Sequence, residues 1–248
     1  MPGPLSFLGA PALLLHDNAT MIQPSPVDPP LVRAAAPLER AIRRYDRLSR
    51  VYDWSASFGA AVGARALSLA DPRPGERVVE IGVGTGRDLP PLRERIGPAG
   101  RLVGIDLSAG MLREARARLR AGALRDVVLQ RADARALPLA TAWADLLFCS
   151  RVLDLVDTAS IVAILEECRR VVRPGGRLVL VHMSKPDASR SWFERLYTAR
   201  LGIGGGLFVS RPVVAEPFLA ALGFEVLERV YVRSLPVGSE VVLARRPA

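Results

Sequence analysis

Five short apolar runs, separated by turns and helical patterns, organise the chain between residues 77 and 183. They read RVVEIG (77–82), RLVGID (101–106), DVVLQRAD (126–133), ADLLFCS (144–150) and GRLVLVHM (176–183). Near-continuous apolar strands that alternate with amphipathic helices are typical of a parallel sheet covered by helices on both faces. The alternation therefore predicts an α/β fold with a doubly wound sheet.

Other patterns predict the helices between these strands and the end of the chain. Apolar residues at three- to four-residue spacing predict helices over 57–70, 108–120 and 160–172, with Ser108 and Asp157 as N-caps. The tail FEVLERVYVRSLPVGSEVVLARRP contains two strand-like runs around the turn SLPVGS. This tail is expected to form a hairpin that completes the sheet.

The N-terminal 37 residues differ from the rest because they are rich in proline and end in IQPSPVDPPLVRAAAP. Residues 1–37 are therefore expected to be a disordered extension, followed by one domain over residues 38–248. Residues 38–70 are expected to form N-terminal cap helices. The first of them, over 38–52, carries five arginines, which either face solvent or dock on anionic lipid.

The turn after the first apolar run, in VVEIGVGTGRDLPPL (78–92), has glycines at 82, 84 and 86. Glycine lets the backbone approach a ligand, and the helix that follows offers free N–H groups. A dinucleotide site has the spacing G-x-G-x-x-G, whereas the third glycine here comes one residue early. Glu80 precedes the turn, and a carboxylate there disfavours a pyrophosphate but suits an ammonium group. A nicotinamide oxidoreductase is therefore not expected.

Acids also end the second and third apolar runs. Asp106 is placed to accept hydrogen bonds from ribose hydroxyls, and Asp133 is placed to bond an adenine amino group. A ligand that combines an ammonium group, a ribose and an adenine is S-adenosylmethionine.

Five segments at strand ends, in order along the chain, resemble the class I S-adenosylmethionine-dependent methyltransferases: EIGVGTG, GIDLSAGML, RADARALPL, ADLLFCSRVLDLVD and RRVVRPGGRLVLVHMSKP. Within this class, GIDLSAGML and SKP are similar to the ubiquinone/menaquinone-biosynthesis C-methyltransferases. The resemblance covers residues 38–248. It implies a Rossmann-like, doubly wound sheet of seven strands with the last strand antiparallel, and S-adenosylmethionine as the cofactor.

The resemblance also implies which residues hold the cofactor. Around its methionine part it puts Glu80, Gly82, Gly84, Thr85 and Gly86, with Ser150 and Arg151 closing over them. It puts Asp106, Leu107 and Met111 at the ribose and adenine, and Asp133 with Ala134 at the edge of the adenine. Tyr45 and Tyr52 match an N-terminal helix that often covers the pocket in such enzymes.

Two side chains near strand ends are candidate general bases, although methyl transfer needs a base only when the acceptor must lose a proton. His182 lies near the end of the fifth run, where the quinone-pathway relatives often have an acid, and is either a base or an orienting or structural histidine. Asp154 follows the fourth run and is either a base or a turn residue. Residues 184–222 are expected to form an acceptor-side lid. Its aromatic residues either cover a lipid-like acceptor or pack in the core: Trp192, Phe193 and Tyr197.

These patterns predict a methyltransferase that acts on a small or lipid-like acceptor, by C- or O-methylation of a quinone-like or phenolic molecule. Two alternatives stay open, which are N-methylation of a phospholipid such as phosphatidylethanolamine and non-catalytic binding of S-adenosylmethionine by a regulatory protein. Nucleic acid is not expected as a partner. CSRVLDLVD stands where amino-methylating nucleic-acid enzymes usually carry an Asn-Pro-Pro-Tyr-type tetrapeptide.

Composition and charge add weaker expectations. The formal charge of +9 comes almost wholly from arginine, since Lys185 is the only lysine, which indicates a coding bias more than a binding surface. Cys149 and Cys168 form no metal motif and are expected to be buried, reduced thiols. No run reaches the ~18 apolar residues of a membrane span. A cytoplasmic location is expected, with peripheral membrane contact only through residues 38–52. The sequence sets no oligomeric state.

Overall fold

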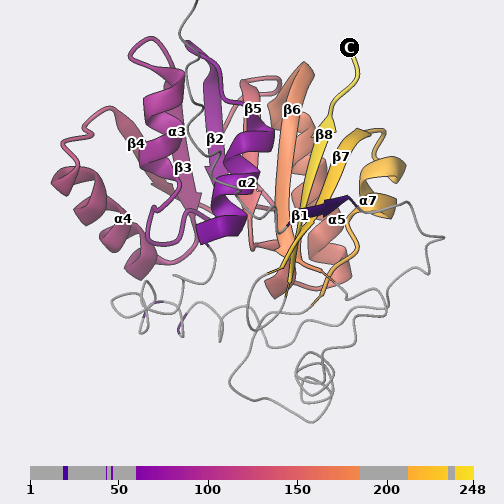
Figure 1. Cartoon of the computed structure of the whole chain (residues 1–248). Coiled ribbons are helices and arrows are strands. Elements are labelled where there is room, and N and C mark those ends of the chain that lie inside the picture. The colour runs from indigo at the N-terminus through magenta and orange to yellow at the C-terminus, as the bar shows by residue number, and fades with distance from the viewer. Residues whose placement is uncertain (1–18, 22–42, 44–45, 47–59, 185–211, 234–237) are drawn as a thin grey trace, which may run out of the picture.

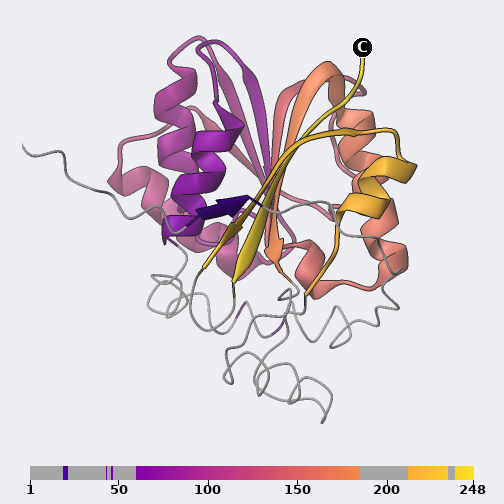
Figure 2. The ribbon, with the colours of Figure 1, turned by 45° about the vertical axis from the view of Figure 1, so that its right-hand side comes forward.

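The computed structural model describes residues 19–21, 43, 46, 60–184, 212–233 and 238–248. In this part of the chain, one mixed sheet has helices on both faces (Figures 1 and 2). Several predicted features lie outside the described residues, namely Tyr45, Tyr52, Trp192, Phe193 and Tyr197. Of the predicted helix over 38–52, Arg43 and Asp46 are described, and both are helical.

The described part of the sheet has eight strands in the order β1-β7-β8-β6-β5-β2-β3-β4. Five consecutive strands in this order, β6 to β4, pair in parallel, whereas β8 runs antiparallel to both β6 and β7. Without β1, this is the predicted seven-stranded sheet with its last strand antiparallel. The strands are β1 (Ala19–Met21), β2 (Arg77–Ile81), β3 (Arg101–Asp106), β4 (Val127–Arg131), β5 (Ala144–Ser150), β6 (Val172–Met183), β7 (Glu225–Val232) and β8 (Ser239–Arg245).

The order of the strands reverses between β2 and β5. The chain runs outward from β2 through β3 to β4, then returns to β5 on the other side of β2 and continues to β6. Open α/β sheets bind ligands beyond the carboxyl ends of their strands at such a switch point. In Figure 1 these ends lie at the lower edge of the sheet.

Two clusters of buried apolar side chains cover the two faces of the sheet. Val78, Phe148 and Leu112 belong to one cluster, and Ile81 and Leu165 belong to the other, as alternation along each strand requires. The first cluster packs under α2 (Ala60–Ala70), α3 (Leu89–Ile96) and α4 (Ala109–Ala121). The second packs under α5 (Thr158–Val171) and α7 (Glu216–Ala221), and the 3-10 turn η2 (Leu153–Leu155) follows β5.

The helix starts that were predicted at Ser108 and Asp157 are confirmed. Ser108 Oγ accepts a hydrogen bond from the N–H of Met111 at 3.1 Å and caps α4. Asp157 Oδ1 accepts one from the N–H of Ser160 at 2.7 Å and caps α5. Each cap satisfies a backbone donor that would otherwise lack a partner, which is worth about 1 kcal/mol.

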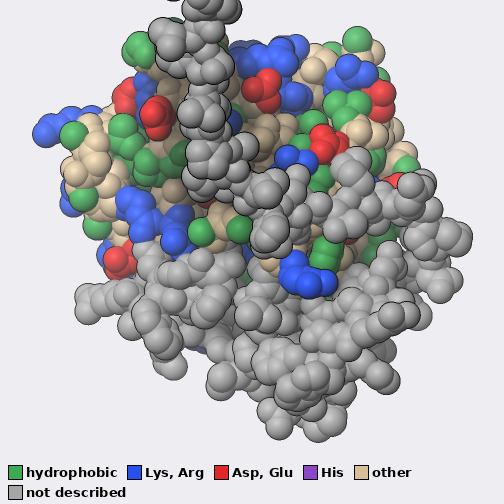
Figure 3. Space-filling model, in the orientation of Figure 1, with side chains coloured by type: hydrophobic (Ala, Val, Ile, Leu, Met, Phe, Trp, Pro, Cys, Tyr) green, Lys and Arg blue, Asp and Glu red, His purple; other side chains and the backbone are tan. Residues whose placement is uncertain are grey.

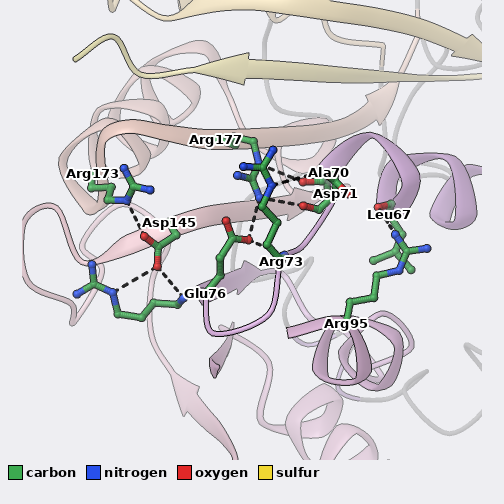
Figure 4. Close-up of polar contacts among 10 residues, drawn as sticks. Leu67, Ala70, Asp71, Arg73, Glu76, Arg95, Asp145, Arg173 and Arg177 are labelled. Atoms are coloured by element: carbon green, nitrogen blue, oxygen red, sulfur yellow. Dashed lines mark hydrogen bonds and ion pairs between the residues drawn. The ribbon is translucent and has the colours of Figure 1, made fainter. Parts of the chain in front are cut away.

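Arginine side chains tie the loops together at the amino ends of the parallel strands (Figure 4). Asp145 at the start of β5 accepts from the Nε of Arg173 at 2.5 Å and from the N–H of Arg77 at 2.8 Å. Arg177 on β6 pairs with Glu76 at 2.8 Å and also donates to the carbonyl of Ala70, at the end of α2. This edge of the sheet is therefore held by structural ion pairs.

Basic side chains are spread over the described surface. Figure 3 shows Arg side chains interspersed with acidic and apolar ones on this face rather than gathered in one patch. Several arginines are in ion pairs, including Arg229, which contacts both Glu216 and Glu240. Within the described ranges, no helix is both long and apolar enough to cross a bilayer.

Both cysteines are buried in the core, as predicted. Cys149 lies on β5 and Cys168 on α5, and they form no disulfide with each other. Burial raises the pKa of Cys149 to about 12 and that of Cys168 well above its ordinary value. Neither thiol is therefore ionised at neutral pH.

The structure differs from the sequence-based expectations at a few elements. Three residues of the Pro-rich extension form β1, which pairs antiparallel with β7, so the expected disorder of residues 1–37 does not hold for Ala19–Met21. β4 ends at Arg131, two residues before Asp133. β6 begins at Val172 because that residue pairs with Ala144 ahead of a bulge. Residues 212–222, part of the predicted lid, pack through Leu219 and its neighbours into the core.

Candidate cofactor and acceptor site

The glycine turn after β2 is held against the end of β3. The N–H of Gly82 donates to the carbonyl of Ile105 at 2.8 Å, and the N–H of Gly86 donates back to Val83 within the turn at 2.8 Å. Gly82, Gly84 and Gly86 have φ values of +73°, +53° and +76°. These left-handed conformations explain why glycine stands at all three positions.

The three glycines have different surroundings. A Cβ on Gly82 would lie 2.3 Å from Cγ2 of Val152, and one on Gly86 would lie 3.0 Å from Cβ of Ala115 on α4. These two glycines allow close packing within the protein. A Cβ on Gly84 would meet no atom of the described residues within 4 Å, so that part of the chain leaves the turn open at its middle glycine. Gly84 is therefore where a ligand has room to approach the backbone.

Glu80 is a buried acid next to this turn. Its side chain is 1% exposed, and Oε2 has no hydrogen-bond partner within the described part of the chain. Burial raises the pKa of Glu80 well above its ordinary value, and the nearby carboxylates of Asp88 and Asp106 raise it further. A buried carboxylate with an unsatisfied oxygen is stabilised by a cationic hydrogen-bond donor. This environment fits the ammonium group that the sequence predicts.

Asp106 joins the end of β3 to the glycine turn. Its Oδ2 accepts from the N–H of Gly84 at 2.8 Å, and its Oδ1 accepts from the N–H of Ser108 at 2.8 Å. Burial raises the pKa of Asp106, although backbone N–H groups that donate to the carboxylate oppose this rise. Next to Asp106 are half-buried Leu107 and, in the first turn of α4, buried Met111.

Asp133 lies just beyond β4 and has a partner of its own. Its Oδ2 pairs with Nη2 of Arg135 at 2.7 Å, and Oδ1 accepts the N–H of Arg135 at 2.9 Å. This pairing lowers the pKa of Asp133. The neighbouring Ala134 is half-buried and packs against the core. An adenine amino group would share Asp133 with Arg135.

The end of β5 borders the glycine turn from the other side. A Cβ on Gly82 would lie 3.3 Å from the carbonyl oxygen of Ser150. Arg151 follows with a left-handed φ of +59°, its N–H donates to Val181 at 2.7 Å, and its Nη2 donates to Ser239 at 2.7 Å. Strained backbone of this kind in a non-glycine residue is concentrated at functional sites. Ser150 and Arg151 thus lie at the switch point, and their closing over the methionine part of the cofactor stays a prediction.

The two candidate bases, Asp154 and His182, meet at one residue. Asp154 Oδ1 accepts from the N–H of Met183 at 2.9 Å, and Nδ1 of His182 lies 3.3 Å from the carbonyl oxygen of Met183. Both side chains are fully buried. Nε2 of His182 has no hydrogen-bond partner among the residues that the structure describes. Asp154 is therefore hydrogen-bonded to the last residue of β6, and His182 is the residue before it on the same strand.

Thr85 is buried in the glycine turn. Its hydroxyl accepts a long hydrogen bond of 3.4 Å from Arg118 on α4.

Sequence reasoning missed two acids near this site. Asp88, at the start of α3, is half-buried and raises the pKa of Glu80. Its position two residues after the third glycine was the available signal. Asp46 lies far away in sequence but accepts hydrogen bonds from Ser108 and Gly110 at the start of α4. A contact over more than sixty residues has no local pattern, so the sequence did not reveal it.

Comparisons with known proteins agree with this geometry. A family model described as "Methyltransferase domain" matches residues 78–176. A malonyl-[acyl-carrier protein] O-methyltransferase from Hahella chejuensis is 31% identical over 211 residues, which cover 82% of this chain and 71% of that protein. The chain belongs to the S-adenosylmethionine-dependent methyltransferases. The family's cofactor is the one predicted from Glu80, Asp106 and Asp133, and the fold is that of class I.

Two further relatives widen the range of acceptors in this methyltransferase family. A nocamycin O-methyltransferase from Saccharothrix syringae is 32% identical over 72% of this chain and 63% of that protein. A demethylmenaquinone methyltransferase from Symbiobacterium thermophilum is 36% identical over 46% of this chain and 45% of that protein. The chain spans between 33% and 63% of the length of several curated relatives that it matches.

Solved structures show the same fold at low identity. A methyltransferase from Aquifex aeolicus superposes with a TM-score of 0.57 at 20% identity, over 84% of this chain and 97% of that one. The [4+2]-cyclase SpnF superposes with a TM-score of 0.68 at 18% identity, over 87% of this chain and 99% of that one. The second of these structures is named as a cyclase. Sharing this fold therefore does not by itself define the reaction that a protein catalyses.

Proposed function

We propose that the protein transfers a methyl group from S-adenosylmethionine to a carbon or oxygen atom of a small quinone-like or phenolic acceptor. The observation that carries this proposal is the buried Glu80 carboxylate, whose Oε2 has no partner in the described part of the chain. It adjoins the open space at Gly84 and the carboxylate of Asp106 on the next strand. When bound, S-adenosylmethionine supplies a methyl group that its sulfonium centre has already activated.

The chain's own residues would mainly bind and orient. Glu80 would accept hydrogen bonds from the ammonium group of the cofactor, and Asp106 would accept them from the ribose hydroxyls. Arg151, fixed by its bonds to Val181 and Ser239, would close the methionine end. Holding two reactants at attack distance supplies a large part of the rate enhancement in such a displacement.

His182 is our candidate for a general base. A carbonyl oxygen can only accept a hydrogen bond, so the contact with Met183 would place the imidazole proton on Nδ1 and leave a lone pair on Nε2. A neutral histidine in this tautomer can take a proton from a phenol or an acidic carbon. Asp154 is the second candidate, although its contact with Met183 makes a positioning role better supported.

The names of the relatives favour this acceptor class without fixing the atom. Some relatives are named as O-methyltransferases, which methylate an oxygen atom. Another is named as a demethylmenaquinone methyltransferase, after a quinone. Phospholipid N-methylation was suggested by the arginine-rich segment 38–52, most of which lies outside the described residues. We therefore retain the quinone-like or phenolic acceptor as the leading proposal.

The test is transfer of label from methyl-labelled S-adenosylmethionine to purified acceptors. Separate reactions would contain a demethylated naphthoquinol, a simple polyhydroxy-phenol, and vesicles of phosphatidylethanolamine. We expect label in the quinol or phenol and a pH–rate profile that changes in His182→Gln. Label in the phospholipid would select the N-methyltransferase alternative. Binding of cofactor with no labelled product in these reactions or in extracts would contradict the proposed transfer and favour a regulatory protein.

A further inference from the structure

A groove of about 490 Å³ lies between the second half of α4 and the strand β4. Three arginines line it together with four apolar side chains, and the arginines are Arg116, Arg120 and Arg125. Within the described sheet, β4 is paired with β3 alone and forms one edge. The groove therefore lies at the β4 edge of the sheet.

This groove is separate from the candidate cofactor site. α4 begins next to Ser108, near the ribose-binding Asp106, and its 13 residues make it about 20 Å long. Arg116 and Arg120 lie in the second half of the helix, and Val127 is the first residue of β4. The cofactor site lies beyond the carboxyl ends of the strands, whereas the groove lies toward the amino end of β4. A ligand in the groove would not occupy the cofactor position.

Apolar side chains form the floor of the groove. Leu119 is buried in the cluster under α4, and three half-buried side chains pack against that cluster, namely Leu124, Val127 and Leu129. We call these four residues the apolar floor. Among the described residues that line the groove, none is aromatic, and arginine supplies every polar side chain. This lining suits an aliphatic chain rather than a ring that needs a partner for stacking.

The three arginines lack acidic partners. In the part of the chain that the structure describes, none of them forms an ion pair or a hydrogen bond through its side chain. Asp126 adjoins Arg125 in the sequence but pairs with Arg93 instead. Three positive charges therefore surround an apolar floor without a negative charge to balance them.

The positions of these arginines are unfavourable for the chain alone. Arg116 and Arg120 are four residues apart in α4, so they lie on one face of the helix, where like charges repel. The negative end of a helix dipole accounts for a positive charge in its last turn, as at Arg120. It does not account for Arg116 one turn earlier or for Arg125 after the helix has ended. An anion in the groove would replace these repulsions with attractions.

The size of the groove favours a small ligand. Small-molecule sites have volumes of about 300–1,000 Å³, whereas a stable protein interface takes about 20 to 30 residues from each partner. We propose that the groove binds a single-chain aliphatic anion. Its carboxylate or phosphate head contacts Arg116, Arg120 and Arg125, since a guanidinium group can bind either head with two hydrogen bonds. Its chain lies along the apolar floor.

Calorimetry on the full chain tests this proposal with alkyl phosphates and carboxylates below their micelle-forming concentrations. Decyl phosphate and decanoate compare the two head groups, and methyl phosphate lacks the chain. A half-buried methylene group changes affinity about twofold. Decyl phosphate should therefore bind about fourfold more tightly than octyl phosphate and about a hundredfold or more tightly than methyl phosphate. Equal affinities for the octyl and decyl compounds, or no binding of either head group, would overturn the proposal.

Variants separate the contribution of the head from that of the chain. Arg116→Gln and Arg125→Gln should each weaken decyl phosphate about fivefold but keep the preference for decyl over octyl phosphate. Leu124→Ala should reduce that preference. Arg113→Gln is the matched control, because it removes an exposed charge from α4 that does not line the groove, and it should change affinity less than about twofold. Equal weakening in Arg113→Gln and Arg116→Gln would contradict a built site.

NMR of the methyl groups locates the bound chain. Decyl phosphate should shift the methyl resonances of Leu124, Val127 and Leu129. It should leave those of Leu227 unchanged, because this residue is 43% exposed on β7, near the other edge of the sheet. Equal shifts at Leu227 and in the groove would indicate detergent-like adsorption and would overturn the proposal.

Other occupants of the groove would give different results. Poly-glutamate that binds while decyl phosphate does not would overturn the proposal in favour of an acidic protein. Retention on phosphatidylglycerol vesicles without binding of decyl phosphate would overturn it in favour of an anionic membrane. None of these measurements uses the cofactor or an acceptor, so binding in the groove can be shown even if the proposed methyl transfer fails.

Discussion

Asp154, fully buried after β5, accepts a hydrogen bond of 2.9 Å from the backbone N–H of Met183, the last residue of β6. β5 and β6 are neighbouring parallel strands, so this bond ties the two ends that border the acceptor side of the site. The contact supports a positioning role for Asp154, which the sequence also makes a candidate base. The two roles make different demands on the side chain.

Substitution of Asp154 separates these roles. Asp154→Ala leaves the N–H of Met183 without its acceptor in the core, which should lower the free energy of unfolding by about 1–3 kcal/mol. Asp154→Asn can still accept that bond through its amide oxygen and should unfold within about 1 kcal/mol of the wild type. The measurement is urea unfolding of both variants. A general base would lose most of kcat in Asp154→Asn, whereas a positioning residue would keep most of it.

Glu80 should make cofactor affinity depend on pH. Its pKa is raised well above 4.5 because the carboxyl group is buried beside Asp88 and Asp106. The ammonium of the cofactor binds the ionised carboxylate, so Glu80 must release its proton on binding. Affinity should therefore be full above the raised pKa and fall as the pH drops through it. Calorimetry in two buffers of different ionisation enthalpy, at pH values on both sides of the fall in affinity, would detect the released proton.

The control for Glu80 uses both a ligand and a variant. 5′-Methylthioadenosine lacks the ammonium group and should bind without releasing a proton. Glu80→Gln should bind S-adenosylhomocysteine more weakly and without proton release. In the ligand-free protein this variant should melt at a higher temperature than the wild type above the raised pKa, because ionising a buried carboxylate opposes folding there. Equal proton release by wild type and Glu80→Gln would assign the proton to another group.

Much of the fold could be predicted because it depends on local patterns. The apolar run RVVEIG needs burial on both faces, and a parallel strand between helices provides it. Ser108 and Asp157 were predicted as N-caps because a cap is decided within four residues. β1 was missed because three residues in a proline-rich segment have no recognisable strand pattern. They form a strand only because β7 offers them an edge.

The site was predictable where each strand end has its own signal. Glu80 lies near the end of β2 and Asp106 ends β3, so the topology brings them to one edge of the sheet. There Asp106 accepts a hydrogen bond from the glycine turn. The partner of Asp133 was not foreseen, because Arg135 could equally have pointed to solvent. Asp46 was not foreseen because its partners, Ser108 and Gly110, lie 62 and 64 residues away along the chain.

Alanine substitutions at Gly82 and Gly84 should affect different properties, chiefly stability at Gly82 and cofactor binding at Gly84. In Gly82→Ala the new methyl group would lie 2.3 Å from Cγ2 of Val152 at a left-handed φ, so the variant should lose about 2–4 kcal/mol of stability. In Gly84→Ala the methyl group meets no atom of the residues that the structure describes, so only about 1–2 kcal/mol for the left-handed backbone is expected. The methyl group would enter the space that we assign to the cofactor. Thermal melts with and without S-adenosylhomocysteine should show a folded Gly84→Ala protein that the ligand barely stabilises.

Gly75→Ala is the matched control for Gly84→Ala. Gly75 also has a left-handed φ, of +84°, and its Cβ would meet no described atom within 4 Å. It lies in the turn before β2, at the opposite end of that strand. The two variants should lose similar stability, and Gly75→Ala should keep the full thermal shift with ligand. A normal ligand shift in Gly84→Ala would show that the cofactor does not approach the turn there.

Removing the carboxylate of Asp106 should weaken cofactor binding more than removing the carboxylate of Asp133. Asp106→Ala loses the ribose acceptor and also leaves the N–H groups of Gly84 and Ser108 without their present acceptor, which should cost about 1.5–3 kcal/mol of binding free energy. Asp133 is already paired with Arg135, so Asp133→Ala should cost less than about 1 kcal/mol. Calorimetric titration of both variants with S-adenosylhomocysteine measures the difference. A loss as large in Asp133→Ala as in Asp106→Ala would mean that Arg135 gives up Asp133 when the cofactor binds.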